Sequence, residues 1–154
     1  MSFPAQYFRA GVGAVIVSDA GLVLALERAD IPGAWQLPQG GLDADEEPLP
    51  AVFREIGEET AIPANALHLL QTSPELLVYE LPPAARRENT GRGQAQYWFF
   101  FRFHGHDQLI DPLQGGEFRS WKWMAFTSLL ESVADFRKPV YLRLFAQFNQ
   151  LSLS

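Results

Sequence analysis

Apolar residues in this chain fall into short runs that are separated by turn-forming residues. Residues 8–17 and 22–28 form two such runs, and the Ser-Asp-Ala-Gly sequence between them favours a turn, so they predict a β-hairpin. Short apolar or alternating runs predict three further strands, at residues 67–71, 76–81 and 119–124. The pattern therefore indicates a sheet of several strands.

Residues 95–103, with the sequence AQYWFFFRF, are apolar on both faces of the strand that they predict. Such a strand is typical of the centre of a sheet that is covered on both sides. Aromatic rings on it belong to the core more often than to a platform that stacks on nucleic-acid bases. We expect this run to be the central strand.

Three segments have the spacing of helices. The first begins near Pro48, where proline is accepted because the amide hydrogen of a first helical turn has no partner in the helix. Its apolar stripe, at positions i, i+3, i+4 and i+7, consists of Leu49, Val52, Phe53 and Ile56. Residues 127–133 and 140–148 follow the same period. Helices on two sides of a mixed β-sheet give an α/β/α sandwich, and no repeat or linker divides residues 1–154, so we expect a single α/β domain.

The composition narrows the class of protein and its partners. The chain has 154 residues and no cysteine, so disulfides are excluded. Its apolar runs are too short to cross a membrane and its first residues lack a secretion signal, so we expect a cytoplasmic protein with no membrane partner. The net charge of −6 argues against binding along long nucleic-acid duplexes, although a nucleotide or an RNA 5′ end remains a possible partner. The oligomeric state stays open.

The whole net charge comes from residues 40–62. This segment holds seven acidic residues and one base, Arg54, whereas the rest of the chain holds eleven acids and eleven bases. Glu55, Glu58 and Glu59 lie at i, i+3 and i+4 of the first predicted helix, so they share one edge of it, about a third of a turn from the apolar stripe. Like charges at this spacing repel, and a divalent cation would reverse the effect. Oxygen ligands without histidine or cysteine favour Mg²⁺ or Mn²⁺, while the alternative is a solvated face of a glutamate-rich helix.

The spacing within this segment resembles the Nudix box of hydrolases that act on nucleoside-diphosphate linkages. From Gly40 the chain has glycine, five residues, Glu46, seven residues and then the sequence REIGEETAI. It departs from the family pattern at Ala61, where the family has glycine. The resemblance implies a Nudix fold and hydrolysis of a phosphoanhydride bond with Mg²⁺ or Mn²⁺ as the cofactor.

The same resemblance implies roles for the charged residues of the box. Glu58 and Glu59 correspond to the principal metal ligands, and Glu55 corresponds to a ligand or to the general base. Arg54 would orient these carboxylates by ion pairing. Glu46 would be a more peripheral partner.

Glu117 is the second candidate for the general base and a further metal ligand, because some family members add a distal glutamate to the site. Its alternative is an ordinary loop glutamate. Gly40 and Gly41 would let the loop backbone approach the metal and the helix. If the helix ends at Ala61 in a left-handed conformation, alanine there costs about 1–2 kcal/mol, but no ligand is lost.

The resemblance covers most of the chain and favours one subfamily. The segments YFRAGVG, WQLPQGG, VYELP, GRGQAQYWFF, EFRSWKW and FRKPVY are similar to bacterial RNA pyrophosphohydrolases and diadenosine polyphosphate hydrolases. Tyr79 lies seventeen residues after the box, where that subfamily has a tyrosine. Leu77 occupies the position at which ADP-ribose hydrolases tend to have proline.

In this subfamily, residues at several matching positions bind the substrate. Arg9, Arg28 and Gln39 would lie along the phosphates. Tyr79 and Phe136 would border the base, and Arg137 or Lys138 would hold further phosphate. Each has an alternative: the strand arginines could pair with acids, the aromatic rings could belong to the core, and the last two cations could flank the final helix.

Two other groups have weaker signals. Arg86, Arg87 and Arg92 lie in a loop that contains proline and glycine, and they indicate either a solvated loop or a lid that collects anions. His68, His104 and His106 lack partners at the spacing of metal ligands, so we expect them at the surface.

The sequence thus predicts a metal-dependent Nudix hydrolase that removes pyrophosphate from an RNA 5′ end or splits a dinucleoside polyphosphate. Hydrolysis of nucleoside triphosphates or nucleotide sugars is the alternative within the same chemistry. A catalytically inactive, nucleotide-binding Nudix module is an alternative of another class, although three clustered glutamates argue against it.

Overall fold

The computed structural model describes residues 6–151. Its centre is a parallel pair of long strands, β1 (Phe8–Val17) and β7 (Gly93–Phe103), which are in register from Phe8 opposite Gly93 to Val17 opposite Arg102. The far side of β7 pairs antiparallel with β5 (Leu67–Thr72) and β6 (Leu77–Glu80). The sheet is therefore mixed, as expected.

The other side of β1 carries the strands that the sequence pattern did not fully anticipate. The short strand β4 (Gln39–Gly41) pairs with the middle of β1, at Gly11 to Gly13. The predicted hairpin is present at its turn, where Val17 of β1 faces Val23 of β2 (Val23–Arg28). Most of β2 instead pairs with β8 (Phe118–Met124) and with β3 (Trp35–Gln36). Because β1 and β2 diverge, β4 can enter beside β1.

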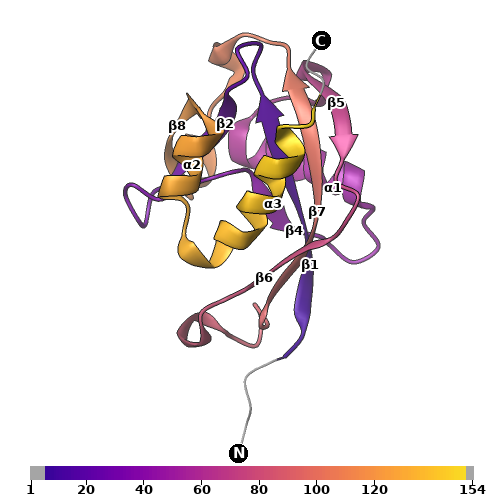
Figure 1. The fold of residues 1–154 in the computed structure, drawn as a ribbon, viewed down its shortest axis with the longest axis vertical. Coiled ribbons are helices and arrows are strands. Elements are labelled where there is room, and N and C mark those ends of the chain that lie inside the picture. The colour runs from indigo at the N-terminus through magenta and orange to yellow at the C-terminus, as the bar shows by residue number, and fades with distance from the viewer. Residues whose placement is uncertain (1–5, 152–154) are drawn as a thin grey trace, which may run out of the picture.

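Helices cover both faces of this sheet (Figure 1). One face carries α1 (Pro48–Thr60), whereas α2 (Phe126–Ser132) and α3 (Lys138–Phe148) lie on the opposite face. Short 3₁₀ turns complete the connections, at Ala64–Ala66, Pro83–Ala85, Asp107–Leu109, Leu113–Gly115 and Asp135–Arg137. The arrangement confirms the α/β/α sandwich with a mixed sheet.

Alternation along β7 builds the two cores. Trp98 and Phe100 pack with the residues of α2 and α3, whereas Phe99 and Phe101 pack with the apolar stripe of α1. All four side chains are buried, which confirms that this run is a central strand covered on both faces. The rings belong to the cores and not to an exposed stacking platform. No helix in residues 6–151 combines the length and the apolar composition that a bilayer crossing requires.

A buried hydroxyl joins α3 to the loop before β4. Tyr141 is fully buried, and its hydroxyl accepts a hydrogen bond of 2.8 Å from the backbone N–H of Leu37. Its ring lies edge-on to Trp98, with 6.1 Å between centroids. Burial raises the pKa of Tyr141, so the hydroxyl stays neutral. The chain that leads into β4 is thus fixed against the opposite face of the sheet.

The end of α1 confirms the expectation for Ala61. Its φ is 65° and its ψ is 2°, which is left-handed, and its N–H donates to the carbonyl of Gly57. Alanine is strained in this conformation, whereas glycine is not.

We expect Ala61→Gly to raise the free energy of unfolding by about 0.5–1 kcal/mol, since the relief of strain exceeds the added entropy of the unfolded chain. Urea denaturation measures the change. Gly57→Ala is the matched control, because Gly57 lies inside α1 with nothing within 4 Å of an added Cβ, and it should stabilise the protein by a similar amount through helix propensity. A destabilised Ala61→Gly variant would contradict the assignment of strain.

Candidate active site

Four carboxylates line one cavity of about 180 Å³. Glu55, Glu58 and Glu59 come from successive turns of α1, and Glu117 comes from the residue before β8. The helical period accounts for the first three, whereas Glu117 comes from just before the start of β8, next to the 3₁₀ turn Leu113–Gly115 that contacts α1. The structure therefore brings these four predicted residues together.

The carboxylates differ in their contact with solvent. The Glu58 side chain is 60% exposed, that of Glu55 is 13% exposed, and Glu59 is buried. Burial, and then the charges of Glu117 and Glu55, raise the pKa of Glu59 well above its usual value. The backbone N–H of Gln39 opposes this, since it donates to both Glu59 oxygens at 3.3 and 3.4 Å. Burial also raises the pKa of Glu55, so the site holds negative charge that the protein only partly compensates.

Arg54 provides most of that compensation. Its Nε and Nη2 each donate to one oxygen of Glu46 at 2.8 Å, and Nη2 also donates to the Gly41 carbonyl at 3.0 Å. Its Nη1 donates to Glu55 at 2.8 Å and to Glu58 at 3.3 Å. The hydrogen bonds from Arg54 lower the pKa of Glu46 to about 2. One guanidinium thus ties the loop before α1 to the carboxylates on α1.

The absence of a side chain at residue 40 lets the Glu55 carboxylate lie against the backbone. A Cβ at Gly40 would lie 2.0 Å from the Glu55 carboxyl carbon, so a larger residue would displace this carboxylate. At Gly41 it would lie 2.6 Å from a guanidinium nitrogen of Arg9. Strand β4 therefore runs directly against the carboxylate of Glu55 on one side and beside Arg9 on the other.

The donor set of this cavity fits a hard divalent cation. All four side chains offer oxygen, and the Gly40 backbone lies against Glu55. Within residues 6–151, no three acidic or histidine side chains are already grouped closely enough to surround one ion. Arg54 holds Glu55 and Glu58 in the present arrangement. These two carboxylates would have to turn toward Glu59 for one ion to contact all three.

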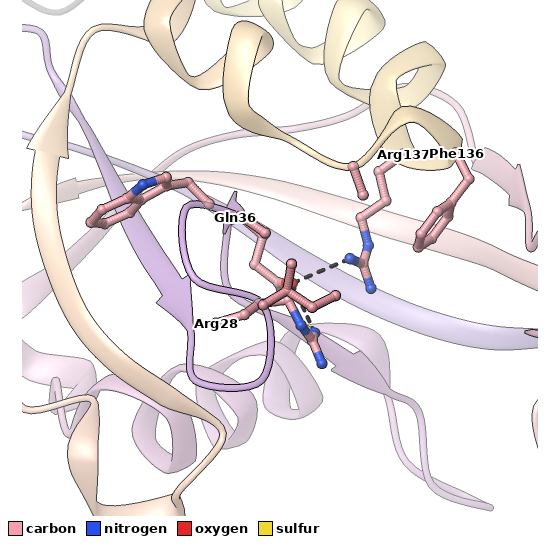
Figure 2. A pocket seen from close by; sticks show the side chains of 8 residues that line it. Arg28, Gln36, Phe136 and Arg137 are labelled. Carbon is pink, nitrogen blue, oxygen red and sulfur yellow. Dashed lines mark hydrogen bonds between the residues drawn. The ribbon is translucent and has the colours of Figure 1, made fainter.

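A second cavity, of about 190 Å³, lies between the β2–β3 connection and the 3₁₀ turn before α3 (Figure 2). Three predicted substrate residues line it, namely Arg28, Phe136 and Arg137. The Gln36 side-chain oxygen accepts from Arg28 at 3.1 Å and from Arg137 at 3.2 Å, so both guanidinium groups point toward it (Figure 2). The pocket also has apolar walls, from Ile31, Ala34, Trp35 and Ala134.

Aromatic rings and a cation form one side of this second cavity. The Arg137 guanidinium lies 4.7 Å from the ring centroid of Phe136 and 5.7 Å from that of Tyr79. Tyr79 is buried and packs against Phe136, with 5.5 Å between the centroids. Of the two rings, Phe136 lines the cavity and Tyr79 supports it from behind. The Arg137 Nε is buried and has no hydrogen-bond partner among the described residues.

Arg28 and Gln39 both interact with the carboxylates of the first cavity, Arg28 through charge and Gln39 through a hydrogen bond. Arg28 makes a bidentate pair with Asp30 at 2.8 and 3.0 Å, as in the alternative of an arginine paired with an acid. The charges of Glu117 and Glu59 contribute to raising the pKa of Arg28, after the larger effect of Asp30. Gln39 reaches Glu59 through its N–H. Arg9, in contrast, is exposed beside Gly41 and has no acidic partner within residues 6–151.

Two buried glutamines that contact predicted site residues escaped the sequence analysis. Gln36 is buried between Arg28 and Arg137, although it is 101 residues from the latter. Gln96 is also fully buried and donates to the side-chain oxygen of Gln39 at 3.2 Å, while its own oxygen accepts from Trp98 at 3.0 Å. A polar residue within the apolar run of β7 was the available signal. The three histidines are exposed, as expected.

Comparison with known proteins agrees with this geometry. The family model described as NUDIX domain matches residues 7–144. The chain is 43% identical to an RNA pyrophosphohydrolase of Acidiphilium cryptum, over 94% of this chain and 92% of that protein. It is 35% identical to Nudix hydrolase 26, chloroplastic, of Arabidopsis thaliana, over 96% of this chain and 72% of that protein.

Solved structures share the fold at lower identity. The Ap4A hydrolase of C. elegans, in a binary complex, has a TM-score of 0.70 and 23% identity over 92% of this chain and 97% of that one. The dihydroneopterin triphosphate pyrophosphohydrolase of E. coli has a TM-score of 0.72 and 22% identity, over 91% and 97% respectively. The family match over most of the chain and the identity to full-length relatives show that this protein belongs to the Nudix hydrolase family.

Proposed function

We propose that this Nudix hydrolase removes pyrophosphate from the 5′ end of RNA with Mg²⁺ or Mn²⁺ as its cofactor. The observation that carries the proposal is the presence of two cavities, one lined by four carboxylates and one by arginines and an aromatic ring, with Arg28 of the second close enough to interact with the charges of Glu117 and Glu59 in the first. A polyphosphate would lie between a metal site and a site for a nucleotide. The RNA pyrophosphohydrolases among the relatives, at 36–43% identity, support the choice of substrate.

The chain's own residues would divide the work as follows. Glu58 and Glu59 would hold the cation, with Glu55 either as a further ligand or as the general base; the cation when bound supplies Lewis-acid chemistry and neutralises charge on the phosphate oxygens. Arg54 orients Glu55 and Glu58 before the cation binds, and it would release them to the cation while it stays bound to Glu46. A water oxygen attacks phosphorus while the anhydride bond breaks, and its proton passes to Glu55 or to Glu117, which are the two candidates for the base.

The second cavity would bind the substrate beyond the reacting phosphate. Arg28 and Gln39 interact with the carboxylates, and Arg9 lies beside Gly41 of the strand that approaches them, so these three residues suit the phosphate chain. Phe136 offers a ring face for a base, and Arg137 offers a cation beside it. The base of a dinucleoside polyphosphate could occupy the same position, so such substrates are the second candidate. Nucleoside triphosphates and nucleotide sugars would use fewer of these contacts.

Product analysis tests the substrate. We expect 5′-triphosphorylated RNA to be converted to 5′-monophosphorylated RNA with Mg²⁺, at a higher kcat/KM than diadenosine tetraphosphate, ADP-ribose or nucleoside triphosphates. Reactions without divalent metal serve as the control. Binding of these nucleotides without cleavage of any of them in Mg²⁺ would instead support the non-catalytic module.

Glu58→Gln tests the metal residues. Glu58 is exposed, so the amide should leave the fold intact while kcat falls about 10²–10³-fold, because one ligand charge is lost. Glu131→Gln, at an exposed position of α2 on the opposite face, is the matched control and should retain wild-type kcat. A wild-type rate in Glu58→Gln would exclude this residue from the site.

Metal binding should also stabilise the protein. Mg²⁺ at 100 times its Kd should raise the free energy of unfolding by about 2.7 kcal/mol, which thermal unfolding detects as a higher Tm. Glu59→Gln removes a buried charge that Glu55 and Glu117 repel, so its metal-free Tm should equal or exceed that of the wild type, whereas most of the metal-induced shift disappears. A full Mg²⁺ shift in Glu59→Gln would contradict the assignment, and Glu131→Gln should behave like the wild type.

A further inference from the structure

The ten arginines of the chain fall into two groups according to whether they pair with a carboxylate within the described residues. Arg28, Arg54, Arg92, Arg102, Arg119 and Arg143 each pair with a carboxylate within the described residues. Arg9, Arg86, Arg87 and Arg137 have no such partner in residues 6–151. Arg9 and Arg137 belong to the proposed substrate path. The remaining two lie in the segment that joins β6 to β7.

Strand register places this segment beside that path. Arg9 of β1 faces Gln94 of β7, and Gln94 faces Tyr79 of β6, so the three side chains project from the same face of the sheet. Arg137 lies over the ring of Tyr79. Leu81 is two residues beyond Tyr79, or about 7 Å along an extended chain. The Arg86 Nε donates to the Leu81 carbonyl at 2.9 Å.

Arg86 and Arg87 lie in a turn that hydrogen bonds within the same segment stabilise. Residues 82–92, which we call the arginine loop, project beyond the lower end of the sheet, next to the start of β1 (Figure 1). Arg87 and Gly91 form a β-bridge, and the Thr90 hydroxyl accepts from the Arg87 N–H at 2.8 Å. Gly91 has a φ of +66°, and a Cβ there would lie 2.4 Å from the Tyr7 carbonyl oxygen. The loop is therefore packed against β1.

Most of the guanidinium donors in this loop are available to a ligand. Arg86 uses its Nε on one carbonyl, and Arg87 uses its Nη1 on the carbonyls of Ala84 and Arg86. Each guanidinium has five N–H donors, so several remain without a partner among the described residues. These backbone contacts orient the charges without neutralising them.

The charge balance favours an anionic partner. Residues 80–92 contain three arginines and two glutamates, and Arg92 pairs with Glu80, in a protein whose net charge is −6. The alternative is a solvated loop whose arginines only fix its backbone. That alternative gives no role to the contact of Arg86 with Leu81, two residues from the Tyr79 ring over which Arg137 lies.

We propose that the arginine loop binds the phosphates of a single-stranded RNA chain beyond its second nucleotide. The inference rests on the proposed function and extends it, because it makes a chain of several nucleotides a better substrate than a dinucleotide. The partner is single-stranded because the 5′ end must leave any duplex to enter the second cavity.

The test compares two triphosphorylated RNAs, of two and of eight nucleotides, that share the same 5′ sequence. Arg86→Ala/Arg87→Ala should lower kcat/KM for the longer RNA about fivefold to tenfold and leave the shorter one unchanged. In the same variant, the slope of log KM against log[salt] for the longer RNA should fall by about two, because two phosphate contacts are lost. Arg102→Ala/Arg143→Ala removes the same charge from exposed ion pairs elsewhere and should change neither substrate.

A lysine variant separates charge from loop structure. Arg86→Lys/Arg87→Lys keeps both charges but loses the Nε hydrogen bond to Leu81. Its kcat/KM for the longer RNA should therefore be close to that of the wild type. Equal losses for both RNAs, or a lysine variant as impaired as the alanine variant, would overturn the inference and leave a structural role. Unchanged kcat/KM for the longer RNA in the alanine variant would identify a solvated loop. Hydrolysis of the shorter RNA by the wild type tests the proposed function separately.

Discussion

The active-site region depends on one guanidinium group that balances carboxylates at the edge of a hydrophobic core. Arg54 contacts Glu46, Glu55 and Glu58, and it also binds the Gly41 carbonyl. A charge beside apolar packing is costly unless it is paired, so these contacts stabilise both the helix and the loop that precedes it. Glu59 accepts from the backbone N–H of Gln39 and keeps a raised pKa because it is buried. A divalent cation would neutralise the carboxylate charge that Arg54 does not compensate.

The parallel pair of β1 and β7 fixes how this charge relates to the rest of the surface. Strand β4 pairs with β1 and places Gly40 against Glu55, while Arg9 lies on β1 itself. On the opposite face, the Tyr141 hydroxyl binds the backbone N–H of Leu37, two residues before β4 begins. The helix that follows Arg137 is thereby connected to the strand that approaches the carboxylates. Because Leu37 is two residues from Gln39, a displacement of Tyr141 with α3 would also displace Gln39.

Local periodicity made much of this architecture predictable, and long-range pairing accounts for what it missed. The long strands and the three helices follow from alternation or from the 3.6-residue period, and the spacing of Glu55, Glu58 and Glu59 sufficed to place them on one edge. Strands β3 and β4 have two and three residues, which is too short for a period to show. The convergence of Arg28, Gln36 and Arg137 depends on contacts across about a hundred residues, which no local pattern encodes. The family resemblance indicated Arg28 and Arg137 but gave no reason to expect Gln36 between them.

The central claim is that the carboxylates of α1 form a cation site by exchanging Arg54 for metal. Anomalous diffraction from crystals soaked in Mn²⁺ tests it most directly, because it locates the ion and shows the side chains around it. The account predicts an anomalous peak in contact with oxygens of Glu59 and of Glu55 or Glu58, at about 2.0–2.2 Å, with Arg54 still bound to Glu46. A cavity without a peak at saturating Mn²⁺, with Arg54 still bound to Glu55 and Glu58, would contradict it.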